Sequence, residues 1–130
     1  MSGSAIEKIL KRLSEYPGLQ FGKAGPRLEI AKPNPGGFPM SFVEEAQGFS
    51  VYFGPLRCRF ESEDEALDHL AFGLSKKCRL REMARGKPYK WILEQETAEG
   101  WRAMREAGFL FFRFWRGRTE VVYQNALLSE

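Results

Sequence analysis

The segment MSFVEEAQGFSVYFGPLRCRFE, residues 40–61, decides the fold predicted for this chain. It divides into MSFVEEA (40–46), GFSVYF (48–53) and LRCRFE (56–61). The dipeptides that join these segments, Gln-Gly and Gly-Pro, are turn-like and too short for anything except hairpins. Apolar and polar residues alternate along the second and third segments, as in strands with one covered face. We therefore predict an antiparallel meander of three strands.

An amphipathic helix is predicted on each side of this meander. A capping-box pattern begins at Ser4, apolar residues follow at helical spacing, and Pro17 ends the first helix. The same capping pattern begins at Ser62, and an apolar stripe continues from there to Cys78. A second helix is therefore expected from about 62 to 78.

The remaining segments carry weaker signals. RLEIA (27–31) and YKWILE (89–94) are typical of strands, and TAEGWRAMREAG (97–108) is typical of a short helix closed by glycine. FLFFRFWR and TEVVYQN predict a C-terminal hairpin around Gly117. The expected fold class is α+β. It consists of an antiparallel sheet of about six strands, made of the central hairpin-linked meander and the C-terminal hairpin, with two or three helices packed on it.

Composition predicts one reduced, globular domain over residues 1–130. The chain is 43% hydrophobic and 28% charged, with a net charge of +3. Its longest apolar runs are far shorter than the roughly 20 residues of a membrane-spanning helix, and the first residues do not resemble a secretory signal. Cys58 and Cys78 are too few for a disulfide scaffold and are expected to be buried thiols. These patterns favour a cytoplasmic location without membrane association.

No motif predicts a catalytic, cofactor or metal site. The single histidine, His69, follows Asp68 on a predicted helix, where adjacent side chains point about 100° apart and cannot form a base with its orienting carboxylate. One histidine and two distant cysteines disfavour a metal centre. The Gly36-Gly37 pair lies between two predicted strands and does not open a helix, so it is a connection or the rim of a pocket and not a phosphate loop.

The strongest functional signal is charge asymmetry. Residues 76–118 contain twelve Lys and Arg against five Asp and Glu, and Tyr89 and Trp91 lie beside the densest basic run. Basic groups with interleaved aromatic rings are typical of nucleic-acid binding. The candidate anion-binding or nucleic-acid-binding residues are Lys76, Lys77, Arg79, Arg81, Arg85, Lys87, Lys90, Arg116 and Arg118.

A structural explanation competes with this signal. Lys76, Lys77, Arg79 and Arg81 follow the predicted second helix, where cations are stabilised by the helix dipole. Charges also protect the edge strands of sheets against aggregation. Part of the basic run is thus expected without any ligand.

The C-terminal hairpin predicts self-association, because its first arm carries aromatic rings on both faces. Phe112, Phe114 and Trp115 are the candidate interface, and a homodimer would cover them. The favoured hypothesis is therefore a non-catalytic binding or interaction domain that self-associates, with no cofactor. The alternatives are electrostatic nucleic-acid binding by the 76–118 region and an enzyme acting on an anionic small molecule. The enzyme would bind its substrate through arginines in a pocket between the helices and the sheet, closed by the proline-glycine loop.

Overall fold

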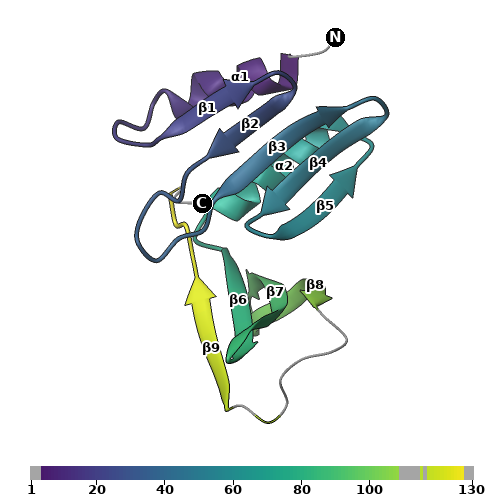
Figure 1. Cartoon of the computed structure of the whole chain (residues 1–130). Coiled ribbons are helices and arrows are strands. Elements are labelled where there is room, and N and C mark those ends of the chain that lie inside the picture. Colours follow the sequence, from purple (N-terminus) through teal and green to yellow (C-terminus); the bar gives the residue numbers. More distant parts are fainter. Residues whose placement is uncertain (1–3, 109–114, 116, 128–130) are drawn as a thin grey trace.

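The computed structural model describes residues 4–108, 115 and 117–127. In this part of the chain two helices and nine strands form an α+β fold with two antiparallel sheets (Figure 1). The α+β class is as predicted. The prediction of one sheet of about six strands is wrong in detail, because the strands are divided between a sheet of five and a sheet of four.

The five-stranded sheet is a meander in which each strand pairs with its neighbour in sequence. The predicted central strands and the weaker strand before them are all present, and a short first strand adds one edge. In order across the sheet, the strands are β1 (Phe21–Ala24), β2 (Arg27–Ile30), β3 (Met40–Glu45), β4 (Gly48–Phe53) and β5 (Leu56–Phe60).

Both helices cover the same face of this sheet (Figure 1). Helix α1 (Ser4–Leu13) and helix α2 (Glu63–Leu74) bury apolar side chains against those of the strands. The alternation predicted for the strands places Phe42 and Val51 opposite each other on the covered face, and both are fully buried. The core is therefore formed by a helical layer on a sheet layer.

Helix α2 begins as predicted but ends four residues early. Ser62 caps it by accepting a hydrogen bond from the Glu65 amide at 3.4 Å. At the other end, Ser75 turns the chain through backbone and hydroxyl hydrogen bonds to the Phe72 carbonyl oxygen. Cys78 then begins a strand, so its apolar character reflects burial in a sheet and not on a helix.

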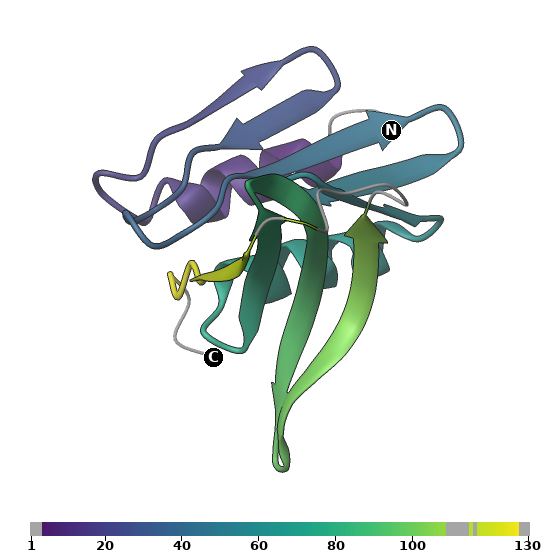
Figure 2. The same cartoon turned by 60° about the horizontal axis from the view of Figure 1, so that its bottom comes forward.

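The four-stranded sheet has the order β8-β7-β6-β9. Figure 1 shows it below the five-stranded sheet, and Figure 2 shows its β7–β8 hairpin projecting from the body of the molecule. Its strands are β6 (Cys78–Arg85), β7 (Lys87–Thr97), β8 (Gly100–Gly108) and β9 (Arg118–Tyr123).

The helix predicted over 97–108 is wrong, since this segment comprises the last residue of β7, a turn, and β8. Thr97 closes the turn by donating a 2.7 Å hydrogen bond from its hydroxyl to the Gly100 carbonyl oxygen. Gly100 has a φ of 114°, a conformation that other residues rarely adopt. Pairing along β7 then overrides the helical propensity of the Ala, Met, Glu and Arg residues that follow.

The two sheets share one hydrophobic core. Leu80 of β6 and Leu93 of β7 are buried in the same cluster as the residues beneath the five-stranded sheet. The segment after β9 adds a polar connection, in which Asn125 is 1% exposed. Its Oδ1 accepts from the Phe38 amide at 2.7 Å, and its Nδ2 donates to the Gly73 carbonyl oxygen at 3.0 Å. The proline-glycine loop is thereby bound to the end of α2.

The predicted C-terminal hairpin lies partly outside the described residues, which include neither Phe112 nor Phe114. Its second arm is β9, which pairs with β6. In the described part of the chain, neither helix is long and apolar enough to cross a membrane.

Candidate anion-binding face

Strand register gathers most of the predicted basic residues on one face of the four-stranded sheet. Arg79, Arg81 and Arg85 occupy odd-numbered positions along β6, with the buried Met83 between the last two, and therefore share a face. Residues directly opposite one another on neighbouring strands also share a face. We call this surface the arginine face; its basic residues are Arg79, Arg81, Arg85, Lys87, Lys90 and Arg118.

A buried carboxylate holds two of these arginines. Glu94 of β7 has a side chain only 4% exposed, and its Oε1 accepts a 2.6 Å hydrogen bond from Arg79 Nε. Its Oε2 accepts from Arg81 Nη2. A carboxylate buried this deeply requires paired charges, and the two guanidiniums supply them. The Glu94 triad, formed by Arg79, Glu94 and Arg81, therefore fixes both guanidiniums on the sheet.

Trp101 completes the environment of the triad. The Arg79 guanidinium carbon lies 4.3 Å from the centre of the Trp101 indole, a distance typical of a cation–π contact. Arg81 Nη1 lies 3.6 Å from a Glu120 carboxylate oxygen, while its buried Nε has no hydrogen-bond partner in the part of the chain that the structure describes. The triad thus has one carboxylate between two cations, and one buried donor of Arg81 is unused among the described residues.

Three cations meet at one end of the arginine face. Arg85 is directly opposite Lys87 on β7 and directly opposite Arg118 on β9. Neighbouring side chains in such pairs have Cβ atoms about 4.5–5.5 Å apart, and like charges at this spacing repel. Lys87 and Arg118 are exposed, and neither forms an ion pair with any residue that the structure describes. We call these three residues the cationic corner.

The other predicted basic residues do not join this surface in the same way. Lys76 and Lys77 are exposed in the connection between α2 and β6, at the opposite end of the sheet from the cationic corner. Lys90 lies on the arginine face but pairs with Glu106 at 3.0 Å. Arg116 lies outside the described residues.

The helix-dipole explanation for the basic run is wrong, because α2 ends at Leu74 and has no basic residue in its last turn. Arg79 and Arg81 belong to β6 and bind a carboxylate of β7. Their position is therefore explained by the sheet and not by helix capping.

The opposite face of the same sheet carries a second polar cluster. The Glu82 carboxylate accepts hydrogen bonds from the Trp91 indole at 3.1 Å and from the Tyr123 hydroxyl at 3.2 Å. Burial, and then the neighbouring Glu82 charge, raise the pKa of Tyr123. These contacts join three neighbouring strands, and we assign this cluster to the stability of the sheet.

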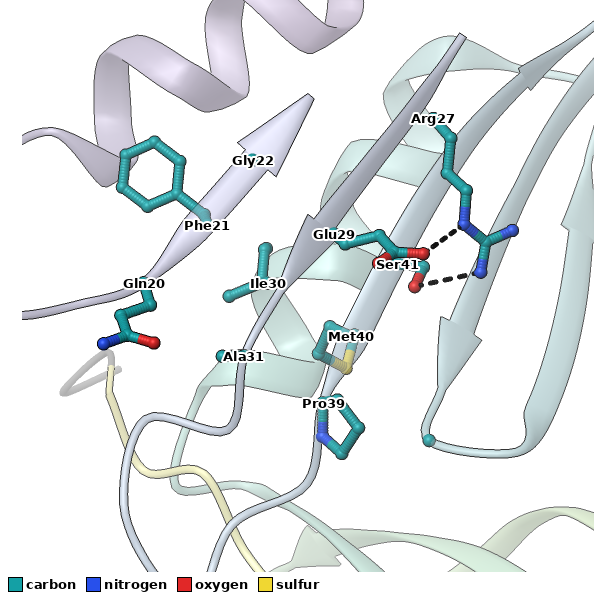
Figure 3. A pocket seen from close by; sticks show the side chains of 11 residues that line it. Gln20, Phe21, Gly22, Arg27, Glu29, Ile30, Ala31, Pro39, Met40 and Ser41 are labelled. Carbon is teal, nitrogen blue, oxygen red and sulfur yellow. Dashed lines mark hydrogen bonds and ion pairs between the residues drawn. The ribbon is translucent and has the colours of Figure 1, made fainter. Parts of the chain in front are cut away.

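A hollow of about 550 Å³ lies at β1–β3 of the five-stranded sheet (Figure 3). Gly22 and Ala31 are part of its lining and contribute little or no side-chain volume there. Arg27 lies along one side, with its Nε 2.6 Å from Glu29 and its Nη2 3.4 Å from the Ser41 hydroxyl. This guanidinium is thus already paired with a carboxylate.

Further across the five-stranded sheet, Glu45 is also neutralised by its neighbours. It accepts a hydrogen bond from the buried Ser50 hydroxyl at 2.9 Å and lies 3.0 Å from Arg57 and 3.3 Å from Arg59. The Ser50 hydrogen bond, followed by the Arg57 charge, holds the pKa of Glu45 below its usual value of 4.5. This network balances charge locally.

His69, Cys58 and Cys78 lie outside these networks. His69 packs its ring against Phe60, with the ring centres 4.4 Å apart, and its Nδ1 lies 2.8 Å from the Glu65 carbonyl oxygen. Burial raises the pKa of both cysteine thiols, Cys58 and Cys78. Among the described residues, no three His, Cys, Asp or Glu side chains are placed to hold a metal ion.

The sequence predicts the basic residues of the arginine face but gives no role to Glu94 or Trp101. It predicts a helix around Trp101, and Glu94 is only the last residue of a predicted strand. The signal available in the sequence was a turn around Gly100, because a hairpin at that point pairs the residues after it, including Trp101, with β7. Trp115 of the predicted interface is 63% exposed.

Neither a protein-family model, nor a curated protein, nor a solved structure matches this chain.

Proposed function

We propose that this chain binds single-stranded nucleic acid through the arginine face. The observation that carries the proposal is the strand register, which aligns Arg79, Arg81 and Arg85 along β6 and adds Lys87 and Arg118 beside them. Alternate residues on a strand are about 6.6–6.8 Å apart, and Arg85 lies two such steps beyond Arg81, so these cations form a row and not a single point. A row of cations suits a polymer that carries repeated phosphates.

The triad geometry supports phosphate recognition in particular. Arginine donates through a planar fork that matches phosphate oxygens, and a guanidinium already held in place loses less entropy on binding. Glu94 and Trp101 hold Arg79 in this way, at 2.6 Å and 4.3 Å respectively. The sheet presents these groups on a face and not on an inserted helix, which favours an open strand over the groove of a duplex.

The test is the salt dependence of binding to a labelled single-stranded oligonucleotide of random sequence, measured by fluorescence anisotropy. The triple variant R85Q/K87Q/R118Q removes the cationic corner, and K11Q/K23Q/K32Q removes three exposed lysines from other elements as a control of equal charge. Single-strand binding has a slope of about −0.7 per phosphate contact in log K against log salt concentration. We expect the corner variant to lose about two units of slope and the control variant to keep the wild-type slope.

Two results would contradict the proposal. One is no detectable binding at roughly 50 mM salt, where electrostatic binding is strong. The other is an equal loss in the two triple variants, which would mean that net charge alone controls the affinity. Circular dichroism of both variants verifies that they remain folded.

Self-association is a second candidate function, and exposed apolar residues near the end of the chain favour it. Val121 and Val122 of β9 are 45% and 44% exposed, and β9 is the last strand in the sheet order. Strands at the edges of sheets readily pair with another chain. Sedimentation equilibrium of the wild type and of V121T/V122T tests this. A dimer weakened by the double substitution is expected, and a wild type that stays monomeric at high micromolar concentration would contradict it.

A further inference from the structure

We infer that Trp101 binds a nucleobase by stacking, so that the ligand of the arginine face is a strand that carries bases and not any polyanion. This inference rests on the proposed function and identifies which group of the polymer is recognised besides its phosphates. Trp101 shares a face with the Glu94 triad, because it lies two residues along β8 from Ala103, which is directly opposite Glu94. Cations alone attract any chain of repeated negative charges, whereas an aromatic ring beside them adds a contact for a base.

The Trp101 indole is held in place by a fixed cation and lies at the edge of the sheet. The Arg79 guanidinium carbon is 4.3 Å from the centre of the ring, and Arg79 Nε is bound to the buried Glu94 carboxylate at 2.6 Å. Because β8 is the first strand in the sheet order, no further strand of the described chain lies beyond Trp101. The β7–β8 hairpin projects from the body of the molecule (Figure 2), and Gly100 and Arg102 on either side of Trp101 are exposed. The indole is only partly buried, so a ring from outside the chain can reach it.

A second tryptophan of this sheet, Trp91, has a different environment. Trp91 lies on the opposite face of β7, where its indole N–H donates a 3.1 Å hydrogen bond to Glu82. The Trp101 indole N–H forms no hydrogen bond with any residue that the structure describes. An indole with a structural role in a sheet usually has such a partner when it is buried. Trp101 therefore retains both ring surface and a donor that a base can use.

The phosphates next to such a base would lie beside the arginines of the triad. Arg79 contacts the indole, and Arg81 follows it along β6 by two residues, about 6.6–6.8 Å away. A guanidinium matches phosphate oxygens, while an indole matches the face of a base. A duplex offers its bases less readily, because each base is already paired and stacked, and taking one out of the stack costs free energy. The contact between Arg79 and Trp101 thus favours an unpaired strand.

The experiment compares two single strands of equal length and charge, an oligothymidylate and an abasic oligomer with the same sugar–phosphate backbone, each labelled at one end. Fluorescence anisotropy measures their affinities for the wild type and for Trp101→Leu over a range of salt concentrations. We expect the wild type to bind the oligothymidylate about ten times more tightly, as one base stacked on an aromatic side chain would provide. Trp101→Leu is expected to bind the two oligomers equally. Because this substitution removes no charge, the slope of log K against log salt concentration should keep its wild-type value.

Tyr52→Leu is the matched control. Tyr52 is also partly buried and has a guanidinium over its ring, that of Arg27 at 5.2 Å, but it belongs to β4 of the five-stranded sheet. This variant is expected to keep the tenfold preference, and Trp101→Phe, which keeps an aromatic ring, to retain part of it. Circular dichroism verifies that all three variants remain folded.

Four results would overturn the inference. Equal wild-type affinities for the two oligomers, with salt-dependent binding retained, would exclude base recognition and leave the proposed function standing. An equal loss of affinity for both oligomers in Trp101→Leu, with a smaller salt slope, would mean that Trp101 acts only by holding Arg79. A tenfold preference that survives in Trp101→Leu would show that the base is bound elsewhere. Failure of the wild type to bind either oligomer would overturn both the inference and the proposed function.

Discussion

Replacing Asn125 with alanine tests the connection between the two ends of the fold. The Asn125 side chain serves two backbone groups that are distant in sequence, the Phe38 amide and the Gly73 carbonyl oxygen. Both hydrogen bonds are buried, at 2.7 Å and 3.0 Å. Alanine would leave a donor and an acceptor without partners in the interior, and would also open a small cavity.

The expected loss follows from these two orphaned groups. A buried polar group left unsatisfied costs about 1–3 kcal/mol, so the two together cost about 2–6 kcal/mol of unfolding free energy. Asn34→Ala is the matched control. Asn34 also forms two hydrogen bonds, a donor bond to the Asn125 carbonyl oxygen at 2.7 Å and an acceptor bond from the Gly36 amide at 2.9 Å. Because Asn34 is only partly buried, water can replace its side chain at a cost of about 1 kcal/mol.

Urea unfolding followed by circular dichroism measures both variants. With a denaturant slope of about 1–3 kcal/mol/M, a loss of about 3 kcal/mol lowers the midpoint by roughly 1–3 M. The Asn34→Ala midpoint is expected to lie much closer to the wild type. If the free energies of unfolding of the two variants agree within about 0.5 kcal/mol, the buried hydrogen bonds of Asn125 do not have the assigned role.

Three further predictions concern the core and its titratable groups. Gly73→Ala places a Cβ 2.8 Å from the Met40 sulfur and should destabilise the protein by about 1–3 kcal/mol in urea unfolding, whereas Gly22→Ala, with no atom within 4 Å, should have little effect. The pKa of Glu45 is lowered by folding, so its contribution is present above pH 4.5 and is lost as the pH falls through the lowered value. In urea unfolding across this range, the free energy of unfolding of the wild type should fall toward that of Glu45→Gln by up to about 1 kcal/mol. A difference that stays constant with pH would contradict this. Burial raises the pKa of the Cys78 thiol, so iodoacetamide should label it only as urea opens the chain, and rapid labelling of the native protein would disprove that burial.

Local signals made the meander and the helix starts predictable. The turns beside Gly48 and Gly54 specify hairpins within a few residues, and the Ser62 cap acts over a single turn. The end of α2 was ambiguous. Cys78 continues the helical spacing of Leu74, but it also alternates with Leu80 as a strand residue does. Packing in the shared core decides between the two patterns.

The candidate site was predictable in composition but not in arrangement. Charge asymmetry identifies the basic residues, since it needs only the sequence. Which of them share a face depends on the pairing of β6 with β7 and β9, and β9 follows β6 only after two further strands. The roles of Glu94 and Trp101 depend on the same pairing, because helical propensity opposed the strand that carries Trp101.

The order of strands has a consequence for the route of folding. Every pair in the five-stranded sheet joins sequence neighbours, so this sheet closes only short loops and can form early, while the chain is still being synthesised. The arginine face cannot be completed at that stage. Arg118 can pair with Arg85 only after the β7–β8 hairpin has been synthesised. Asn125, the partner of the Phe38 amide, follows Phe38 by 87 residues. A nascent chain would thus have a structured first half before it has a complete binding surface.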